Sequence, residues 1–92
     1  MKKNTVTQGH IDYILSQSEV QVKEAFGKTV IVACKLPNGF VIVEASSCVD
    51  PANFSLELGK GICMERITNR IWELEGYLLQ NRLYETSDPT SL

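Results

Sequence analysis

The residues best suited to bind a small anion lie before and along one long helical segment of this chain. Arg66 and Arg70 are four residues apart, so on a helix they are neighbours whose like charges repel. The anion that relieves this repulsion is either Glu73 or a bound phosphate, for which arginine provides a planar fork of donors. Just before the helix, the amide of Asn53 suits a base or ribose edge, and Phe54 suits stacking on a base. Together with the free N–H groups of the helix start, these residues predict a site for a small nucleotide.

The residues with catalytic potential are few and scattered, so no catalytic residue is assigned. His10 has no acid or nucleophile near it in the sequence and is predicted to be solvated. Cys34 and Cys63 fall at expected core positions, and Cys48 lies in a loop. The spacing of the three cysteines contains no close pair, which argues against a zinc site and against a disulfide scaffold. We therefore expect a non-enzymatic protein without a metal or cofactor.

A short helix and three strands precede the long helix. Thr7 is the predicted N-cap of a helix that ends near residues 16–18. The apolar period then changes to two over residues 19–26, and strands follow at residues 29–36 and 40–45, separated by the turn Pro37-Asn38-Gly39. Because residues 30–33 and 40–43 are apolar at consecutive positions, we expect the sheet to be covered on both faces, by helices and by another subunit.

A polar loop over residues 46–54 leads to a helix expected at residues 55–82. Asp50 is the predicted cap of a short turn that begins at Pro51, and either Asn53 or Ser55 caps the long helix. Helical spacing assigns one stripe of the long helix to the core: Leu56, Cys63, Ile67, Ile71, Leu74 and Leu78. A narrow polar strip is assigned to Gly59, Arg66, Arg70, Glu73 and Tyr77.

A second apolar group lies roughly opposite the core stripe, where a monomeric surface helix is normally polar. Its members are Leu58, Ile62, Trp72 and Leu79, which we predict to form a homo-oligomer interface. Gly59 and Gly61 weaken the helix, which indicates either a close approach of another backbone or a ligand, or a local irregularity at the helix start.

The composition excludes several classes of partner and compartment. Nine Lys and Arg stand against eleven Asp and Glu, and no basic run is present, so duplex nucleic acid is not an expected partner. The chain lacks the apolar run of a signal peptide or a membrane span, which predicts a protein without membrane contact in a cytoplasm. Residues 1–84 are expected to form one domain, and residues 85–92 a flexible tail.

Three ordered motifs make residues 26–79 resemble a family of small tailed-phage proteins, the gene-product forty-nine/sixty-six family. They are KLPNGF at residues 35–40, SSCVDPANF at residues 46–54 and IWELEGY at residues 71–77. The resemblance implies a phage accessory protein in the host cytoplasm. In size, hairpin and arginine-bearing helix, the chain is also similar to phage anti-defence sponges, which sequester cyclic nucleotide or cyclic ADP-ribose immune signals.

The sequence thus predicts an α+β domain of order α-β-β-β-α, with the long helix across a small antiparallel sheet. The preferred function is binding and sequestration of a small anionic nucleotide by Asn53, Phe54, Arg66 and Arg70. The alternative is a protein-interaction module that binds and inhibits a host protein, in which Trp72 and the other members of the second apolar group form the contact.

Overall fold

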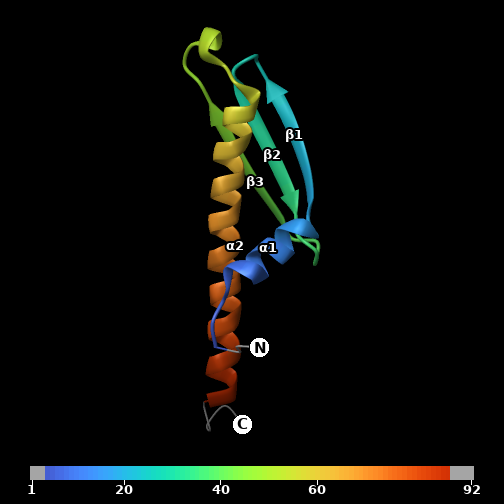
Figure 1. The fold of residues 1–92 in the computed structure, drawn as a ribbon, viewed down its shortest axis with the longest axis vertical. Helices are drawn as coiled ribbons and strands as arrows, with labels where there is room; N and C mark the ends of the chain where they lie inside the picture. Colours follow the sequence, from blue (N-terminus) through green and yellow to red (C-terminus); the bar gives the residue numbers. More distant parts are fainter. Residues whose placement is uncertain (1–3, 88–92) are drawn as a thin grey trace.

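A computed structural model describes residues 4–87 and confirms the α+β class and the predicted order of elements (Figure 1). A short helix precedes three strands, a 3-10 turn and one long helix. Their bounds are α1 Gln8–Ser16, β1 Glu19–Ala25, β2 Thr29–Lys35, β3 Val41–Ser47, η1 Pro51–Asn53 and α2 Leu56–Ser87. Helix α2 extends well past the end of the sheet, and the molecule measures 60 × 24 × 19 Å.

The helix ends differ in one respect from the expectation. Thr7 caps α1 as predicted, because its side chain accepts a hydrogen bond from the His10 amide. Helix α2 continues to Ser87, so residues 85–87, which we expected in a flexible tail, are helical. Residues 85–87 are polar, and the next proline is Pro89, so no helix-breaking residue stands in this stretch. The rest of the predicted tail, residues 88–92, lies outside the described residues.

The three strands form one antiparallel sheet in the order β1-β2-β3. The β1–β2 turn has positive φ angles at Phe26 (60°) and Gly27 (66°), and the Lys28 amide donates a hydrogen bond to the carbonyl oxygen of Ala25 at 3.2 Å. In the β2–β3 turn, Gly39 has a φ of 95°, and Asn38 Oδ1 accepts a hydrogen bond from the Phe40 amide. The Pro37-Asn38-Gly39 turn therefore forms as predicted.

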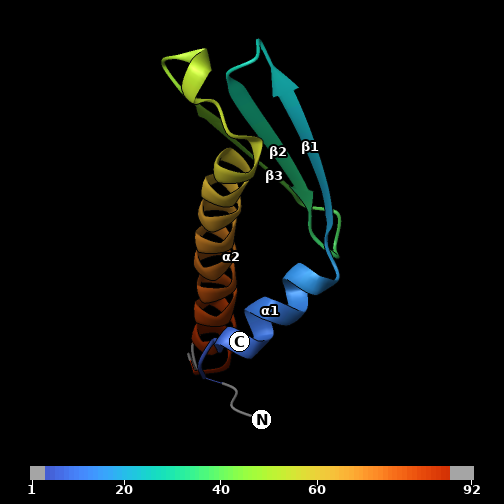
Figure 2. The same ribbon diagram turned by 45° about the horizontal axis from the view of Figure 1, so that its top comes forward.

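Within the described residues, helices cover only one face of the sheet, and cover of the other face by another subunit stays a prediction. Val30, Val32 and Cys34 point toward α2 and are buried. On the opposite face, Val41 and Val43 keep 50% and 56% of their surface exposed. Figures 1 and 2 show α2 and α1 on the same side of the sheet. Apolar residues at consecutive strand positions indicated burial on both faces, but the two α-helices of the described residues lie on one face.

The core stripe of α2 is confirmed in its central part. Cys63, Ile67 and Ile71 are fully buried against the sheet and α1, and Leu74 packs at the edge of this core. Leu56 and Leu78 are 45% and 46% exposed, because they lie in the first turn of α2 and beyond the main core contacts.

The second apolar group on α2 does not form one exposed face. Trp72 packs against the core, to which α1 contributes Ile11 and Ile14, so part of its surface is used within the chain. Leu58 is 66% exposed, whereas Ile62 and Leu79 are half-buried. The helical spacing gave the direction of these side chains, but it did not show that α1 packs alongside α2.

Gly59 belongs to the core contact and not to the polar strip. A Cβ at this position would lie 2.6 Å from Cγ2 of Val30, so glycine is what lets α2 approach β2 this closely. Gly61 has open space at the corresponding point. A close approach therefore occurs at Gly59, but it is made by the Val30 side chain of the same chain and not by another backbone or a ligand.

These two glycines form a matched pair for a stability test. We expect Gly59→Ala to lower the free energy of unfolding by about 1–2 kcal/mol, because the clash with Val30 outweighs the gain in helix propensity. Gly61→Ala should instead raise it, by up to about 1 kcal/mol. Urea unfolding measures both. Equal effects of the two substitutions would contradict the packing described for Gly59.

Candidate functional site

The loop between β3 and α2 folds into a cap at the upper end of the molecule (Figure 1). Asp50 Oδ1 accepts a hydrogen bond from the Ala52 amide at 2.9 Å and starts η1, as predicted. Ser55 Oγ accepts one from the Leu58 amide at 3.1 Å, so Ser55, of the two candidates, caps α2. These caps fix Asn53 and Phe54 immediately before the first turn of α2.

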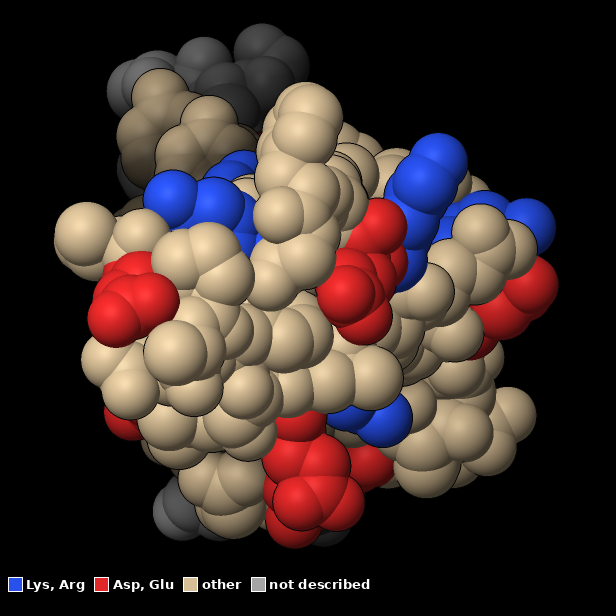
Figure 3. All heavy atoms as spheres, turned by 90° about the horizontal axis from the view of Figure 1, so that it is seen from above, with Lys and Arg blue, Asp and Glu red and all other residues tan. Residues whose placement is uncertain are grey.

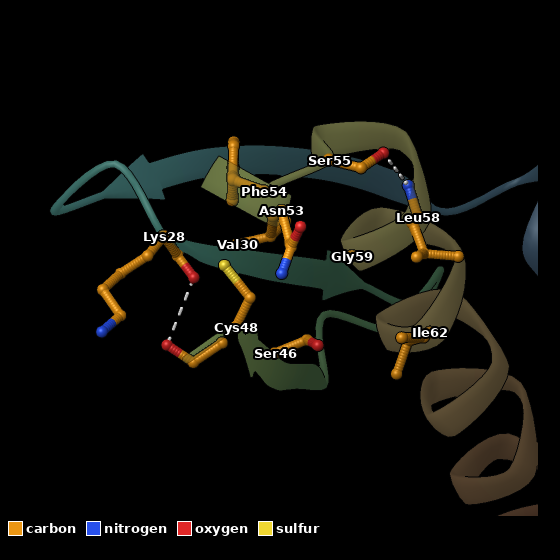
Figure 4. A pocket seen from close by; sticks show the side chains of 11 residues that line it. Lys28, Val30, Ser46, Cys48, Asn53, Phe54, Ser55, Leu58, Gly59 and Ile62 are labelled. Atoms are coloured by element: carbon orange, nitrogen blue, oxygen red, sulfur yellow. Dashed lines mark hydrogen bonds between the residues drawn. The ribbon is translucent and has the colours of Figure 1, made fainter. Parts of the chain in front are cut away.

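Asn53 and Phe54 line a small pocket of about 120 Å³, here called the helix-start pocket. Its walls come from the β1–β2 turn, the end of β3, the loop and the first turns of α2 (Figure 4). Among the residues that line it are Lys28, Ser46, Cys48, Asn53, Phe54 and Ile62. In Figure 4 the Asn53 amide and the Cys48 thiol point into the pocket, and the Lys28 side chain extends away from it.

Few charged groups lie at this pocket. Lys28 is the charged residue among those that line it, and no carboxylate is among them. The start of α2 presents backbone N–H groups on the same side, one of which is already bound by Ser55. On the end of the molecule seen in Figure 3, basic and acidic side chains are interspersed. An anion here would therefore be held by individual contacts and not by a broad basic surface.

Neither predicted arginine lines the helix-start pocket. Arg66 lies one turn after Ile62, and its Nη1 donates a hydrogen bond to the carbonyl oxygen of Ala45 at 2.9 Å. Ala45 immediately precedes Ser46, which lines the pocket, and Arg66 keeps further N–H donors beyond this one bond. Arg70 Nε lies 4.0 Å from Glu73 Oε1 in an exposed ion pair. The like charges thus have separate partners within the chain, and their spacing does not by itself require a bound anion.

Sequence reasoning missed a second cavity, between α1, the β2–β3 turn and α2. This cavity, about 370 Å³ in volume, is lined by Tyr13, Leu36, Leu78 and Arg82, among others. At its edge His10 Nε2 lies 2.9 Å from Glu75 Oε1, which corrects the prediction of a histidine without an acidic partner. The two residues are far apart in the sequence, and no local pattern shows that α1 packs across α2.

The three thiols differ in accessibility. Burial raises the pKa of Cys34 and Cys63 above the ordinary value of a thiol. Cys48 is half-buried, and its Sγ donates a weak hydrogen bond to the carbonyl oxygen of Asp50 at 3.3 Å. The described residues contain no group of three or more His, Cys, Asp or Glu side chains that could hold a metal ion.

This difference predicts the thiol reactivity of the folded protein. One thiol per chain, Cys48, should react quickly with an aromatic disulfide reagent at mildly alkaline pH, and the other two only on unfolding. The Cys48→Ser variant should fold normally and lose the fast phase. Fast labelling that persists in this variant would show that Cys34 or Cys63 is accessible.

The fold is that of an α+β protein in which two helices cover one face of a three-stranded sheet. A family model described as the phage protein (N4 Gp49/phage Sf6 gene 66) family matches residues 6–83. The chain belongs to this family, which confirms the resemblance read from its three motifs. No curated protein and no solved structure matches the chain. Within the described residues, no helix is long and apolar enough to span a membrane.

Proposed function

We propose that this phage protein acts without catalysis and binds a small anionic nucleotide at the helix-start pocket. The ligand class is a cyclic oligonucleotide or cyclic ADP-ribose signal of bacterial immunity, and binding would sequester it in the host cytoplasm. One observation carries the proposal: the loop places Asn53 and Phe54 together at the start of α2, where both line one pocket that has no carboxylate among its lining residues.

Each part of this arrangement suits one part of a nucleotide. The Asn53 amide points into the pocket and can both donate to and accept from a base or ribose edge. Phe54 offers a ring for stacking, and the backbone N–H groups at the start of α2 suit a phosphate. Arg66, which donates to the carbonyl oxygen of Ala45 next to Ser46, supplies additional donors for a second phosphate.

The size of the pocket limits how a nucleotide is held. At about 120 Å³ it is smaller than the roughly 300–1,000 Å³ of typical pockets for small organic ligands. It suits one phosphate or one ribose, and the remainder of the ligand would extend over Ser46 toward Arg66. We therefore expect a ligand that carries more than one phosphate to bind more tightly than a mononucleotide.

Calorimetric titration tests this proposal. The panel contains cyclic dinucleotides, cyclic trinucleotides and cyclic ADP-ribose isomers, with adenosine monophosphate for comparison. We expect at least one cyclic compound to bind with a dissociation constant below about 10 µM, and Phe54→Ala to weaken it about tenfold or more. Phe40→Ala removes a half-exposed aromatic ring far from the pocket and serves as the control. Unchanged binding by Phe54→Ala, or no binding by any compound, would contradict the proposal.

A second candidate, a module that binds a host protein, is favoured by the uncovered face of the sheet. Val41 and Val43 lie on it half-exposed, next to a shallow groove of about 180 Å³ that Ala33 and Val41 line. Leu58 adds exposed apolar surface on α2, whereas Trp72 contributes only its unburied part. Loss of biological activity in a folded Val43→Asp variant, together with a titration in which no nucleotide binds, would favour this candidate.

A further inference from the structure

Strand β1 is an edge of the sheet that the described part of the chain, residues 4–87, leaves uncovered. Helix α2 packs against β2 and β3, and in Figures 1 and 2 β1 lies on the side away from α2. At the opposite edge of the sheet, β3, one backbone acceptor already has a partner, because Arg66 donates a hydrogen bond to the carbonyl oxygen of Ala45. All residues of β1 except Ala25 are exposed.

An edge of this kind can accept another strand. Strand β1 contains no proline, and its seven residues pair continuously with β2 without a bulge, so its outer edge is regular. Val20 and Val22 are each 38% exposed although they stand opposite the buried Cys34 and Val32 in the sheet. They lie on the helix-covered face, at the point where α2 no longer covers it. A strand added beside β1 would cover them.

We propose that two copies of this chain associate through antiparallel pairing of their β1 strands, with Gln21 opposite Gln21 of the second copy. In an antiparallel pair, residues directly opposite one another share a face of the sheet. This register sets Val20 opposite Val22 of the second copy, twice, on the helix-covered face. On the open face it sets Glu19 opposite Lys23 of the second copy, again twice. The sequence of β1 is therefore complementary to itself in both charge and apolarity.

Other registers also place the helix-covered faces of the two copies on the same side of the joined sheet. The two neighbouring ones described next lack this complementarity. Pairing centred on Val22 would place Val20 opposite Glu24 of the second copy, so each exposed valine would face a carboxylate. Pairing centred on Lys23 would place two lysines directly opposite each other, which is destabilising. Lysine in an edge strand usually opposes strand addition, and here it disfavours the register in which it faces itself and favours the one in which Glu19 faces it.

The intramolecular neighbours of Glu19 support the same register. Lys35 Nζ lies 3.8 Å from Glu19 Oε1, and both side chains are more than half exposed. In the paired sheet each Glu19 carboxylate would lie between Lys35 of its own chain and Lys23 of the second copy. The proposal is independent of the nucleotide site, because none of these residues lines the helix-start pocket.

Sedimentation of the full chain at micromolar concentration and low salt tests the association. The wild type should show twice the 10.3 kDa mass of one chain. Glu19→Lys and Lys23→Glu should each be monomeric, because each creates two like-charge pairs. An equimolar mixture of these two variants should regain the double mass, since each glutamate then faces a lysine. Glu65→Lys makes the same charge change on exposed α2 and should remain dimeric. A monomeric wild type, dimeric single variants or a mixture that stays monomeric would each overturn the proposal.

A cysteine cross-link tests the register separately. Gln21 is the residue that faces its own copy, so Gln21→Cys in the Cys48→Ser background should form an intermolecular disulfide when diamide is added as oxidant. Lys23→Cys in the same background is the control and should form much less, since its counterpart is Glu19. Preferential cross-linking of Val22→Cys over Gln21→Cys would show that the strands pair in another register and would overturn the one proposed.

Discussion

Replacing Ile67 by alanine is expected to lower the free energy of unfolding by about 3–5 kcal/mol. Ile67 is fully buried at the centre of α2, where the helix meets the sheet, and it shares the core with Val32 and Ile71. The loss combines the removed apolar contacts with the cavity that a rigid neighbourhood cannot fill. In a domain of this size the melting temperature should fall by more than about 10 °C.

The control for this substitution is Tyr77→Ala on the same helix. Tyr77 is 75% exposed, so its removal should change the stability by no more than about 0.5 kcal/mol. Thermal and urea unfolding of the two variants give the comparison. A small effect of Ile67→Ala would mean that α2 does not pack on the sheet through the central part of its core stripe.

Replacing Arg66 by alanine is expected to weaken binding of the best nucleotide in the panel about tenfold to a hundredfold. The Arg66 guanidinium donates to the carbonyl oxygen of Ala45, the residue before Ser46 of the helix-start pocket. Loss of a charge-assisted hydrogen bond to phosphate costs about 1.5–3 kcal/mol. The folded state should lose little, since exposed polar contacts contribute under about 1 kcal/mol.

Arg70→Ala provides the matched comparison. Its guanidinium pairs with Glu73 and lies farther along α2 from the pocket, so this variant should bind with an affinity within about threefold of the wild type. Calorimetric titration of both variants at one salt concentration gives the ratio. Equal losses would mean that the two arginines act together, as the sequence alone suggested, and that the ligand extends farther along α2.

The fold was predictable where local signals are strong. The Thr7 cap, the Pro37-Asn38-Gly39 turn and the spacing of Cys63, Ile67 and Ile71 each determine structure over a few residues. Burial was harder to predict, because the apolar runs of β2 and β3 look the same whether one face or both are covered. The packing of α1 and α2 shows which face the helices of residues 4–87 cover.

The part of the candidate site that is formed by neighbouring residues in the sequence was predictable. Asn53 and Phe54 adjoin the helix start in the sequence, and the caps at Asp50 and Ser55 hold them there. Lys28 could not be assigned to the pocket, because it arrives from a hairpin turn that is distant in the sequence. Gly59 was misassigned for a related reason: helical spacing gives an angle around α2, but not how close β2 approaches it.

The interactions between distant segments account for the remaining differences. Arg66 was expected to face a ligand or Glu73, and it instead donates to the backbone of β3. His10 was expected to be alone, and it meets Glu75 across the contact between α1 and α2. Both partners become visible only when the helices are placed in space, since no periodic pattern encodes them.

Native mass spectrometry of the protein purified from infected, defence-competent cells is the most direct test of nucleotide sequestration. We expect the wild type to retain a small molecule with the mass of a cyclic nucleotide or a cyclic ADP-ribose isomer. A folded variant with both Asn53→Ala and Phe54→Ala should be isolated without it, and Phe40→Ala should retain it. Recovery of the wild type with no bound small molecule, or equal retention by the double variant, would contradict a nucleotide site at the start of α2.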